Sequence, residues 1–438
     1  MRISKRTLTR NISSTVLVQL ANYVFPMISV PIIVRIIGPD KYGMISFAQA
    51  IITYFTLVIN YSFNFTATRQ VAQYRDNKDA LNRIFSTVFG TKLFLFLIST
   101  VLFFSCFLVF PIFKDNAKVF LSTYLVCVAW VITPDWFYQG MSELHRAAVF
   151  NLITKVVFTG LILIIIHQPD DFYWQPLAFS ISQLVVSGVS WRWAMRRYNL
   201  TLKLPEIQSI FNTIYEDRMI FFSSVVISLY TSTNIIVLAA LASTTEVGYF
   251  SAAQKFITIA QAVITIPLSQ SIFPLVSQAF GEGEIQGIQT VKRITPYVTL
   301  ATFAIGIGML VLGPSIVVFY YGDKFESSKR MFQIMALVPF VISISNLYGI
   351  QLMLNLKMDK VFFKIVAAGA AFSLISNAIM TQAFNGIGSS LSWLITECFI
   401  SLTMGLILFR RDIQIFSWTQ FRMVINDLKI FSAKTLRR

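Results

Sequence analysis

The sequence predicts an all-α polytopic membrane protein, with about twelve transmembrane helices in two parallel-repeat six-helix lobes around a central cavity. Three observations predict this fold class. Of the 438 residues, 55% are hydrophobic and only 13% are charged, whereas soluble domains carry about 25% charged residues. Apolar runs of roughly 20 residues, the length that crosses the hydrocarbon core, alternate with short polar loops. A polar pattern also recurs in both halves of the chain.

The apolar runs follow one another along the whole chain. Those of the first half cover 11–37, 42–66, 84–110, 117–139, 148–167 and 172–194. Those of the second half cover 217–241, 248–276, 294–320, 330–354, 361–381 and 387–409. The first run is too long, and too polar at its start, for a cleaved signal peptide. We therefore expect an N-terminal lobe (1–205), a C-terminal lobe (206–409) and a basic cytoplasmic tail (410–438).

The formal net charge of +16 is explained by where the basic residues lie along the chain. With the N-terminus inside, most Lys and Arg residues fall on cytoplasmic segments, which is the positive-inside pattern. Both termini are then cytoplasmic, and no nucleic-acid partner is needed to account for the basicity. The outer loop "YYGDKFESSKR" is the main exception, although Asp323 and Glu326 accompany its three cations.

The reactive residue types give no sign of a metal site, a cofactor site or a catalytic group. Three cysteines lie inside predicted spans without ligand-like spacing, so they are expected to be small buried hydrophobes. The two histidines are isolated in the sequence. The cysteines are Cys106, Cys127 and Cys398, and the histidines are His145 and His167.

The segment "YGMISFAQA" begins at Tyr42, and "VGYFSAAQK" begins at Val247, so similar residues recur at an offset of 205. Polar residues continue at steps of three and four in both copies, which places them on one helix face. Similar stripes follow the first span (11–37) and the seventh (217–241). Such stripes can join helices by hydrogen bonds, but four stripes paired by a repeat favour a hydrated cavity. The cavity candidates are Gln19, Asn22, Ser46, Gln49, Thr53, Asn60, Asn64, Ser251, Gln254, Thr258 and Gln261.

Ionisable residues inside spans are costly and therefore candidates for function. Lys255 adjoins the second stripe, and a cavity role is favoured for it over a side chain that reaches the membrane interface. Arg35 and Arg69 fit either role, and Lys92 is expected to reach the interface. Glu397 and Asp135 are candidates for ion or proton coupling, although Asp135 could instead cap backbone groups beside Pro134.

Three segments resemble the polysaccharide transporter family, and within it the bacterial O-antigen flippases. They are "RIIGPDKYGMISFAQAIITYF" (35–55), "NYSFNFTATRQVA" (60–72) and "PDWFYQG" followed by Glu143. The resemblance implies the fold of the multidrug, oligosaccharidyl-lipid and polysaccharide exporter superfamily. It also implies transfer of an undecaprenyl pyrophosphate-linked sugar repeat unit to the periplasmic leaflet of the bacterial inner membrane.

By this resemblance, Arg35, Arg69 and Lys255 would attract the pyrophosphate. Membrane lipids, a polysaccharide polymerase and chain-length proteins are the expected partners besides the lipid-linked oligosaccharide. A cation-coupled multidrug antiporter and a peptidoglycan-precursor flippase remain alternatives. An ATP-driven pump is disfavoured because "GEGEIQG" lacks the Lys and Ser/Thr that bind nucleotide, and a membrane glycosyltransferase or polymerase is disfavoured because the outer loops are short.

Overall fold

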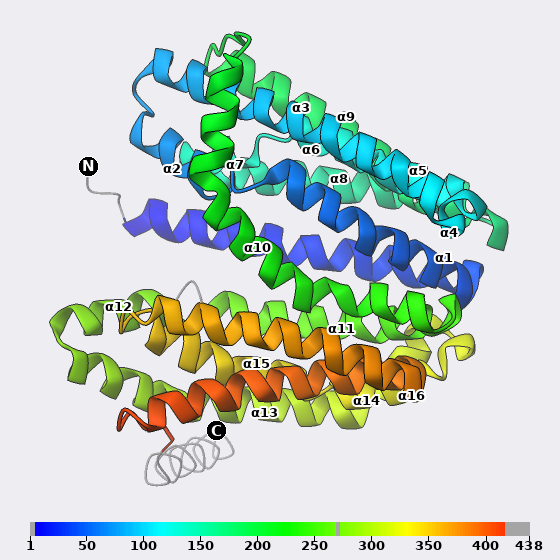
Figure 1. Cartoon of the computed structure of the whole chain (residues 1–438), viewed down its shortest axis with the longest axis vertical. Coiled ribbons are helices and arrows are strands. Elements are labelled where there is room, and N and C mark those ends of the chain that lie inside the picture. Colours follow the sequence, from blue (N-terminus) through cyan, green and yellow to red (C-terminus); the bar gives the residue numbers. More distant parts are fainter. Residues whose placement is uncertain (1–4, 269–271, 417–438) are drawn as a thin grey trace. The chain divides into compact units, whose positions relative to one another are not determined.

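The computed structural model describes residues 5–268 and 272–416, and it describes their side chains except at 5–29, 230–231 and 265–267. All regular elements within these ranges are helical, and each predicted span overlaps helical residues (Figure 1). On length and apolar composition, 7 helical segments of the described chain could cross a membrane, or up to 8 if a bent pair counts as one span. The all-α polytopic fold class is confirmed.

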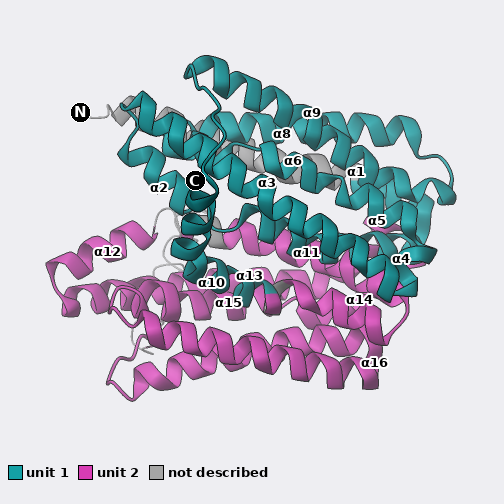
Figure 2. Ribbon diagram, turned by 45° about the horizontal axis from the view of Figure 1, so that its top comes forward, with its two compact units in different colours: residues 1–228 teal, residues 229–438 magenta. Residues whose placement is uncertain are grey.

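Contacts between residues divide the chain into two compact units, Met1–Ser228 and Leu229–Arg438 (Figure 2). The helices of unit 1 are α1 (Lys5–Asn60), α2 (Thr66–Gln73), α3 (Lys78–Val109), α4 (Pro111–Asp115), α5 (Ala117–Tyr124), α6 (Val126–Ile132), α7 (Asp135–Gly140), α8 (Leu144–Ile165), η1 (Pro169–Tyr173) and α9 (Trp174–Arg197). Helix α10 (Ile207–Leu241) contains the boundary.

Unit 2 continues from α10. Its further elements are α11 (Thr244–Pro267), α12 (Phe273–Glu282), α13 (Glu284–Tyr321), η3 (Asp323–Phe325), α14 (Ser328–Met335), α15 (Val338–Asn346), η4 (Leu347–Met353) and α16 (Asp359–Phe409).

The unit boundary lies within α10, whereas the lobes were predicted to meet at residue 205. Two hydroxyl groups explain why the first part of α10 belongs to unit 1. Ser62 Oγ and Thr66 Oγ1 donate to the buried carboxylate of Asp217, at 2.9 and 2.6 Å. Because this carboxylate accepts two charge-assisted hydrogen bonds, it fastens α10 to the turn after α1 and to the first residue of α2.

The two units repeat the same order of elements. Helix α1 is broken at Gly38, whose φ of 78° favours glycine, and the chain breaks at the matching place between α10 and α11. A short helix and a long helix follow in both units, α2 and α3 in one and α12 and α13 in the other. A segmented span and a closing pair of helices then complete each unit.

The closing pair of unit 2 is formed within α16. Asn385 has φ 51° and ψ −132°, so the chain reverses there and the two halves of α16 run side by side (Figure 1). Small hydroxyl residues join the halves: the oxygens of Ser376 and Ser392 are 2.7 Å apart, as are those of Thr381 and Ser389. Close helix contacts of this kind need small side chains in a membrane.

The core of unit 1 is aromatic and centres on α7. Trp136, Phe137 and Tyr138 are buried, and Phe85 of α3 contacts the first two with ring centroids 5.6 and 5.4 Å apart. The hydroxyl group of Tyr138 donates to the carbonyl of Ser190 in α9 at 2.7 Å. The "PDWFYQG" segment therefore anchors α3, α7 and α9 to one another.

We expect Gly388→Ala to destabilise the protein by about 1–3 kcal/mol, the usual cost of overpacking. A Cβ at Gly388 would overlap the carbonyl of Met380 in the other half of α16. Gly160→Ala is the matched control, because a Cβ at Gly160 meets open space. Thermal unfolding of the purified protein measures both changes. Equal melting temperatures for the two variants would contradict the close packing of the α16 halves.

Candidate functional site

The second half of α1 exposes polar side chains at membrane depth. Between Gly43 and Ile59, the exposed residues are Gln49 and Thr53. The hydroxyl group of Thr53 donates to the carbonyl of Gln49 at 2.8 Å. The hydroxyl is therefore satisfied within the helix, while the carboxamide of Gln49 extends from an exposed position.

Helix α11 of unit 2 repeats this arrangement. Between Val247 and Ile264, the exposed residues are Lys255, Thr258 and Val263. Thr258 donates to the carbonyl of Gln254 at 2.9 Å, as Thr53 does to Gln49. The repeat thus preserves both the polar residues and their hydrogen bond. We call Gln49 and Thr53 with Gln254, Lys255 and Thr258 the polar stripes.

The lipid-facing helices differ from the polar stripes in the chemistry of their exposed positions. Every exposed residue of α8 from Val149 to Ile164 is apolar. Helix α3 likewise exposes large hydrophobic residues such as Leu97 (56%) and Val101 (70%). A polar group in hydrocarbon without a partner costs several kcal/mol. The polar stripes are therefore suited to contact water, and α3 and α8 are suited to contact lipid.

The remaining cavity candidates have different surroundings. Ser46 and Ser251 are each only 7% exposed, so both are inside their units. Gln261 is partly buried, and Asn64 is exposed in the turn before α2. The side chains of Gln19 and Asn22 lie outside the described residues.

The two candidate arginines of unit 1 are not brought together. Both Arg35 and Arg69 are exposed. Arg35 precedes the break at Gly38, and Arg69 lies in α2, beyond the opposite end of the second half of α1. That half of α1 alone is roughly 30 Å long at 1.5 Å per residue. One phosphate group therefore cannot contact both arginines in this arrangement.

The sequence predicts that Lys92 reaches the membrane interface, but the structure buries its side chain inside unit 1. It is 2% exposed, and its ammonium group donates to Asn60 Oδ1 and the carbonyl of Trp130, both at 3.1 Å, and to the carbonyl of Thr133 at 3.4 Å. Pro134 has no N–H, so the carbonyl of Trp130 four residues earlier loses its helical donor. Lys92 supplies that missing donor at the break between α6 and α7.

This arrangement also assigns a role to Asn60, which belongs to the predicted stripe. Its amide group donates to the carbonyl of Thr56 at 3.0 Å while its oxygen accepts from Lys92. Asp135 follows Pro134 and is partly buried, with a hydrogen bond to the side chain of Asn151. Both residues thus lie in a polar cluster inside unit 1. The i to i+4 spacing of Trp130 and Pro134 is the sequence signal that could have indicated it.

Glu397 lies inside unit 2. It is 5% exposed, and its described polar contact is a hydrogen bond with Trp393, one turn earlier in α16. No ion pair of Glu397 within 4.0 Å is found among the described residues. The same residues contain no group of three His, Cys, Asp or Glu side chains suited to a metal ion.

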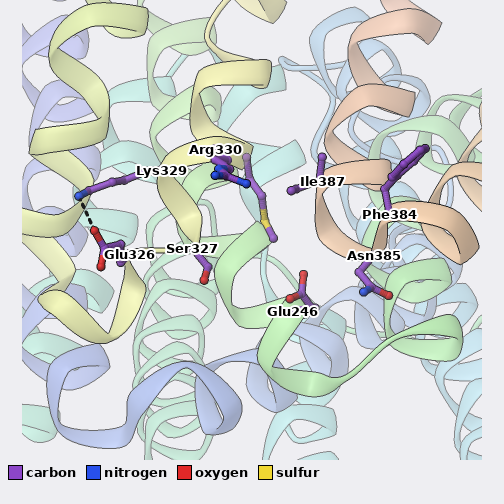
Figure 3. Close-up of a pocket in the computed structure, with 9 residues that line it drawn as sticks. Glu246, Glu326, Ser327, Lys329, Arg330, Phe384, Asn385 and Ile387 are labelled. Carbon is purple, nitrogen blue, oxygen red and sulfur yellow. Dashed lines mark hydrogen bonds and ion pairs between the residues drawn. The ribbon is translucent and has the colours of Figure 1, made fainter.

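A charged pocket at one end of unit 2 was not predicted from sequence (Figure 3). It has a volume of about 470 Å³ and is lined by Glu246, Arg330, Asn385 and the ion pair of Glu326 with Lys329, at 3.0 Å. The carboxylate of Glu246 accepts the backbone N–H of Gly386 at 3.0 Å. An acidic group is favourable there because it caps the N-terminus of the second half of α16.

The family of polysaccharide biosynthesis proteins matches residues 8–280 of this sequence. The chain belongs to this family. Two relatives are named "Putative O-antigen transporter". The one from Escherichia coli (strain K12) is 28% identical over 405 residues, which cover 92% of this chain and 97% of the relative. The one from Shigella dysenteriae is 26% identical over 400 residues, which cover 90% and 98%.

Solved structures with the same fold are membrane transporters. The lipid II flippase MurJ in an inward closed conformation has a TM-score of 0.68 at 14% identity, covering 97% of this chain and 98% of that one. An inward-facing multidrug resistance MATE transporter has a TM-score of 0.69 at 10% identity, covering 91% and 94%. These likenesses establish the fold, and with the apolar helices they identify an integral multi-pass membrane protein of this family.

We expect Thr53→Cys and Thr258→Cys to react with a membrane-impermeant thiol reagent at least about tenfold faster than Leu97→Cys. The reactive thiolate forms only where water solvates its charge. The background would carry serine at Cys106, Cys127 and Cys398. Reaction rates in intact cells and in inverted vesicles measure access from each side of the membrane. Labelling of Leu97→Cys as fast as Thr53→Cys would contradict the assignment of the polar stripes to water.

We expect Lys92→Met to lower the free energy of unfolding by about 2 kcal/mol. Each acceptor left without a donor costs about 1–3 kcal/mol, partly offset because a buried charge is removed. Lys114→Met is the control, since Lys114 is exposed in α4. Thermal unfolding measures both. A normal melting temperature for Lys92→Met together with abolished transport would instead place Lys92 in the transport cycle.

Proposed function

We propose that this protein is a flippase. It moves an undecaprenyl pyrophosphate-linked oligosaccharide of the O-antigen type from the cytoplasmic to the periplasmic leaflet of the bacterial inner membrane. The observation that carries the proposal is the pair of polar stripes, which expose neutral polar groups in each repeat of a membrane protein, together with one lysine in the second repeat. Membership of a polysaccharide biosynthesis family supports the substrate class.

Transfer of a sugar headgroup across a bilayer is limited by the cost of removing its hydroxyl groups from water. Each hydroxyl that enters hydrocarbon without a partner costs several kcal/mol. Carboxamides such as those of Gln49 and Gln254 can donate and accept at once, so they can replace hydrogen bonds to water. The proposed path for the headgroup therefore runs along the polar stripes, while the polyprenyl chain stays in the lipid.

A pyrophosphate group needs cations that attract it without trapping it. Lys255 is the exposed cation of the polar stripes, one residue from Gln254 and three from Thr258. A single ammonium group provides a point charge without the bidentate geometry of arginine. We assign the pyrophosphate contact to Lys255 first. Arg35 and Arg69, at opposite ends of the second half of α1, would act at successive stages.

Alternating access of the two repeats about a central cavity would carry the headgroup across. Glu397 is our leading candidate for coupling to an ion or proton, because it is buried in a span and has no ion pair within the described chain. Asp135 is the second candidate. Its bond to Asn151 beside the break at Pro134 also fits a structural role.

The proposed activity is transport without catalysis, with both termini in the cytoplasm. A polysaccharide polymerase and chain-length proteins are the proposed partners in the membrane. The second candidate function is a cation-coupled antiporter for small molecules, and the buried Glu397 is the observation that favours it. The neutral polar residues on the exposed faces of α1 and α11 favour sugar as the cargo.

The decisive test is a strain that lacks this protein. We expect lipid-linked repeat units to accumulate at the cytoplasmic leaflet and surface polysaccharide to fall. Among complementing variants, Lys255→Ala should impair export, whereas Lys255→Arg should largely retain it because the charge is kept. Equal loss in both variants would indicate packing. If the lipid-linked intermediate stayed at the wild-type level while drug sensitivity rose, the antiporter would replace the flippase.

A further inference from the structure

Helix α9 has an exposed face whose chemistry changes along its length. From Ile181 to Arg196 its exposed residues follow at steps of three or four, so they form a single stripe, and Arg197 is exposed beside its end. Three apolar residues come first and arginines follow at the end of the helix. They are Ile181 (40% exposed), Val185 (58%), Val189 (56%), Arg192 and Arg196.

A groove of about 520 Å³ lies where this stripe changes from apolar to basic. Its lining residues are Val189, Arg192, Trp193, Arg196 and Arg197, all from α9. We call it the arginine groove. It contains three guanidinium groups and no carboxylate, so it is complementary to an anion. Its apolar side continues into the stripe of Val185 and Ile181.

Glu143, whose partner Arg146 lies over the Trp193 ring, is already engaged by other groups. Glu143 forms an ion pair with Arg146, with Oε2 2.7 Å from Nε, and the same oxygen accepts a hydrogen bond from the hydroxyl group of Tyr198 at 2.6 Å. Burial and the Glu143 carboxylate raise the pKa of Tyr198, so this tyrosine stays protonated and can donate. Because this carboxylate is already engaged by the charge of Arg146 and the hydroxyl group of Tyr198, it is poorly suited to neutralise the arginine groove. No ion pair of its arginines appears within the described chain.

Trp193 forms a rigid floor for the groove. The guanidinium group of Arg146 lies over its ring, 4.0 Å from the centroid, and Tyr138 packs against it at 5.7 Å. Tryptophan is enriched where membrane hydrocarbon meets the headgroup layer. The combination of Trp193 with arginines therefore suits the depth where phosphate groups of lipids lie.

We propose that the arginine groove binds the headgroup of an anionic glycerophospholipid, with its acyl chains along Val189, Val185 and Ile181. The phosphate group accepts bidentate hydrogen bonds from the guanidinium groups. At 1.5 Å per residue, the stripe from Ile181 to Arg196 covers roughly 22 Å, enough for a headgroup and much of a chain. Basic residues on this segment place the site in the cytoplasmic leaflet. This inference does not depend on the proposed transport activity.

The test is native mass spectrometry of the full-length protein with phosphatidylglycerol and phosphatidylcholine in mixed micelles. We expect the wild-type protein to bind one phosphatidylglycerol in preference to phosphatidylcholine. The triple variant Arg192→Gln, Arg196→Gln, Arg197→Gln should lose on the order of 100-fold in affinity, at roughly fivefold for each basic residue. Val189→Glu should also weaken binding, because it places a carboxylate among the arginines.

A matched control removes the same charge from the same unit. Lys78, Arg83 and Lys203 are exposed and lie outside the groove. Their triple exchange to Gln should change the affinity by less than about threefold if diffuse attraction is minor. Equal losses in the control and the groove variant, or no loss in either, would overturn the proposal.

A further arm distinguishes the phospholipid from the polyprenyl substrate, which also carries phosphate. Undecaprenyl pyrophosphate is added at a concentration equal to that of phosphatidylglycerol. We expect phosphatidylglycerol to remain bound to the groove. Displacement in the wild-type protein, together with loss of undecaprenyl pyrophosphate binding in the Arg192, Arg196 and Arg197 variant, would make the groove a substrate site and refute the assignment.

Discussion

The structure depends on one constraint, that a polar backbone group freed where a helix breaks or begins needs a partner from the protein. Two of the breaks meet it with different charged side chains. Lys92 donates to the carbonyl of Trp130 that Pro134 leaves without a donor. Glu246 accepts the N–H of Gly386 at the reversal of α16. These charged side chains are therefore explained by the geometry of the breaks, before any role in transport is considered.

Duplication preserved the order of helices but allowed the partners to differ. Lys41 of unit 1 corresponds to Glu246 of unit 2 at the offset of 205 residues. The ammonium group of Lys41 lies over the ring of Phe172, 4.7 Å from its centroid, whereas the carboxylate of Glu246 accepts a hydrogen bond from the backbone N–H of Gly386. The hydrogen bonds of Thr53 and Thr258 are the same in both units. The two threonines thus kept the same residue type and the same hydrogen bond in both units, whereas Lys41 and Glu246 differ in both. This pattern is expected where an exposed surface has the same function in both units.

The exposed faces divide into three chemistries, and each indicates a different surrounding. The apolar exposed face of α8 suits hydrocarbon, and the polar stripes of α1 and α11 suit water. The end of α9 combines Trp193 with arginines, a combination suited to the headgroup layer. Composition averaged over a whole helix hides this division, because α1 and α8 are both apolar overall and differ in which residues face outward.

The sequence by itself determined the helical class, the duplication and the positions of the polar stripes, because hydropathy and a fixed offset are local properties of the chain. Only the tertiary structure decided which polar residues are accessible. Ser46 and Gln49 belong to one sequence stripe, yet Ser46 is buried and Gln49 is exposed. Lys92 was expected at the interface, but the break at Pro134 supplies acceptors in the interior. Asp217 likewise gained its role from Ser62 and Thr66, about 150 residues away in sequence, because folding and not sequence proximity brings such partners together.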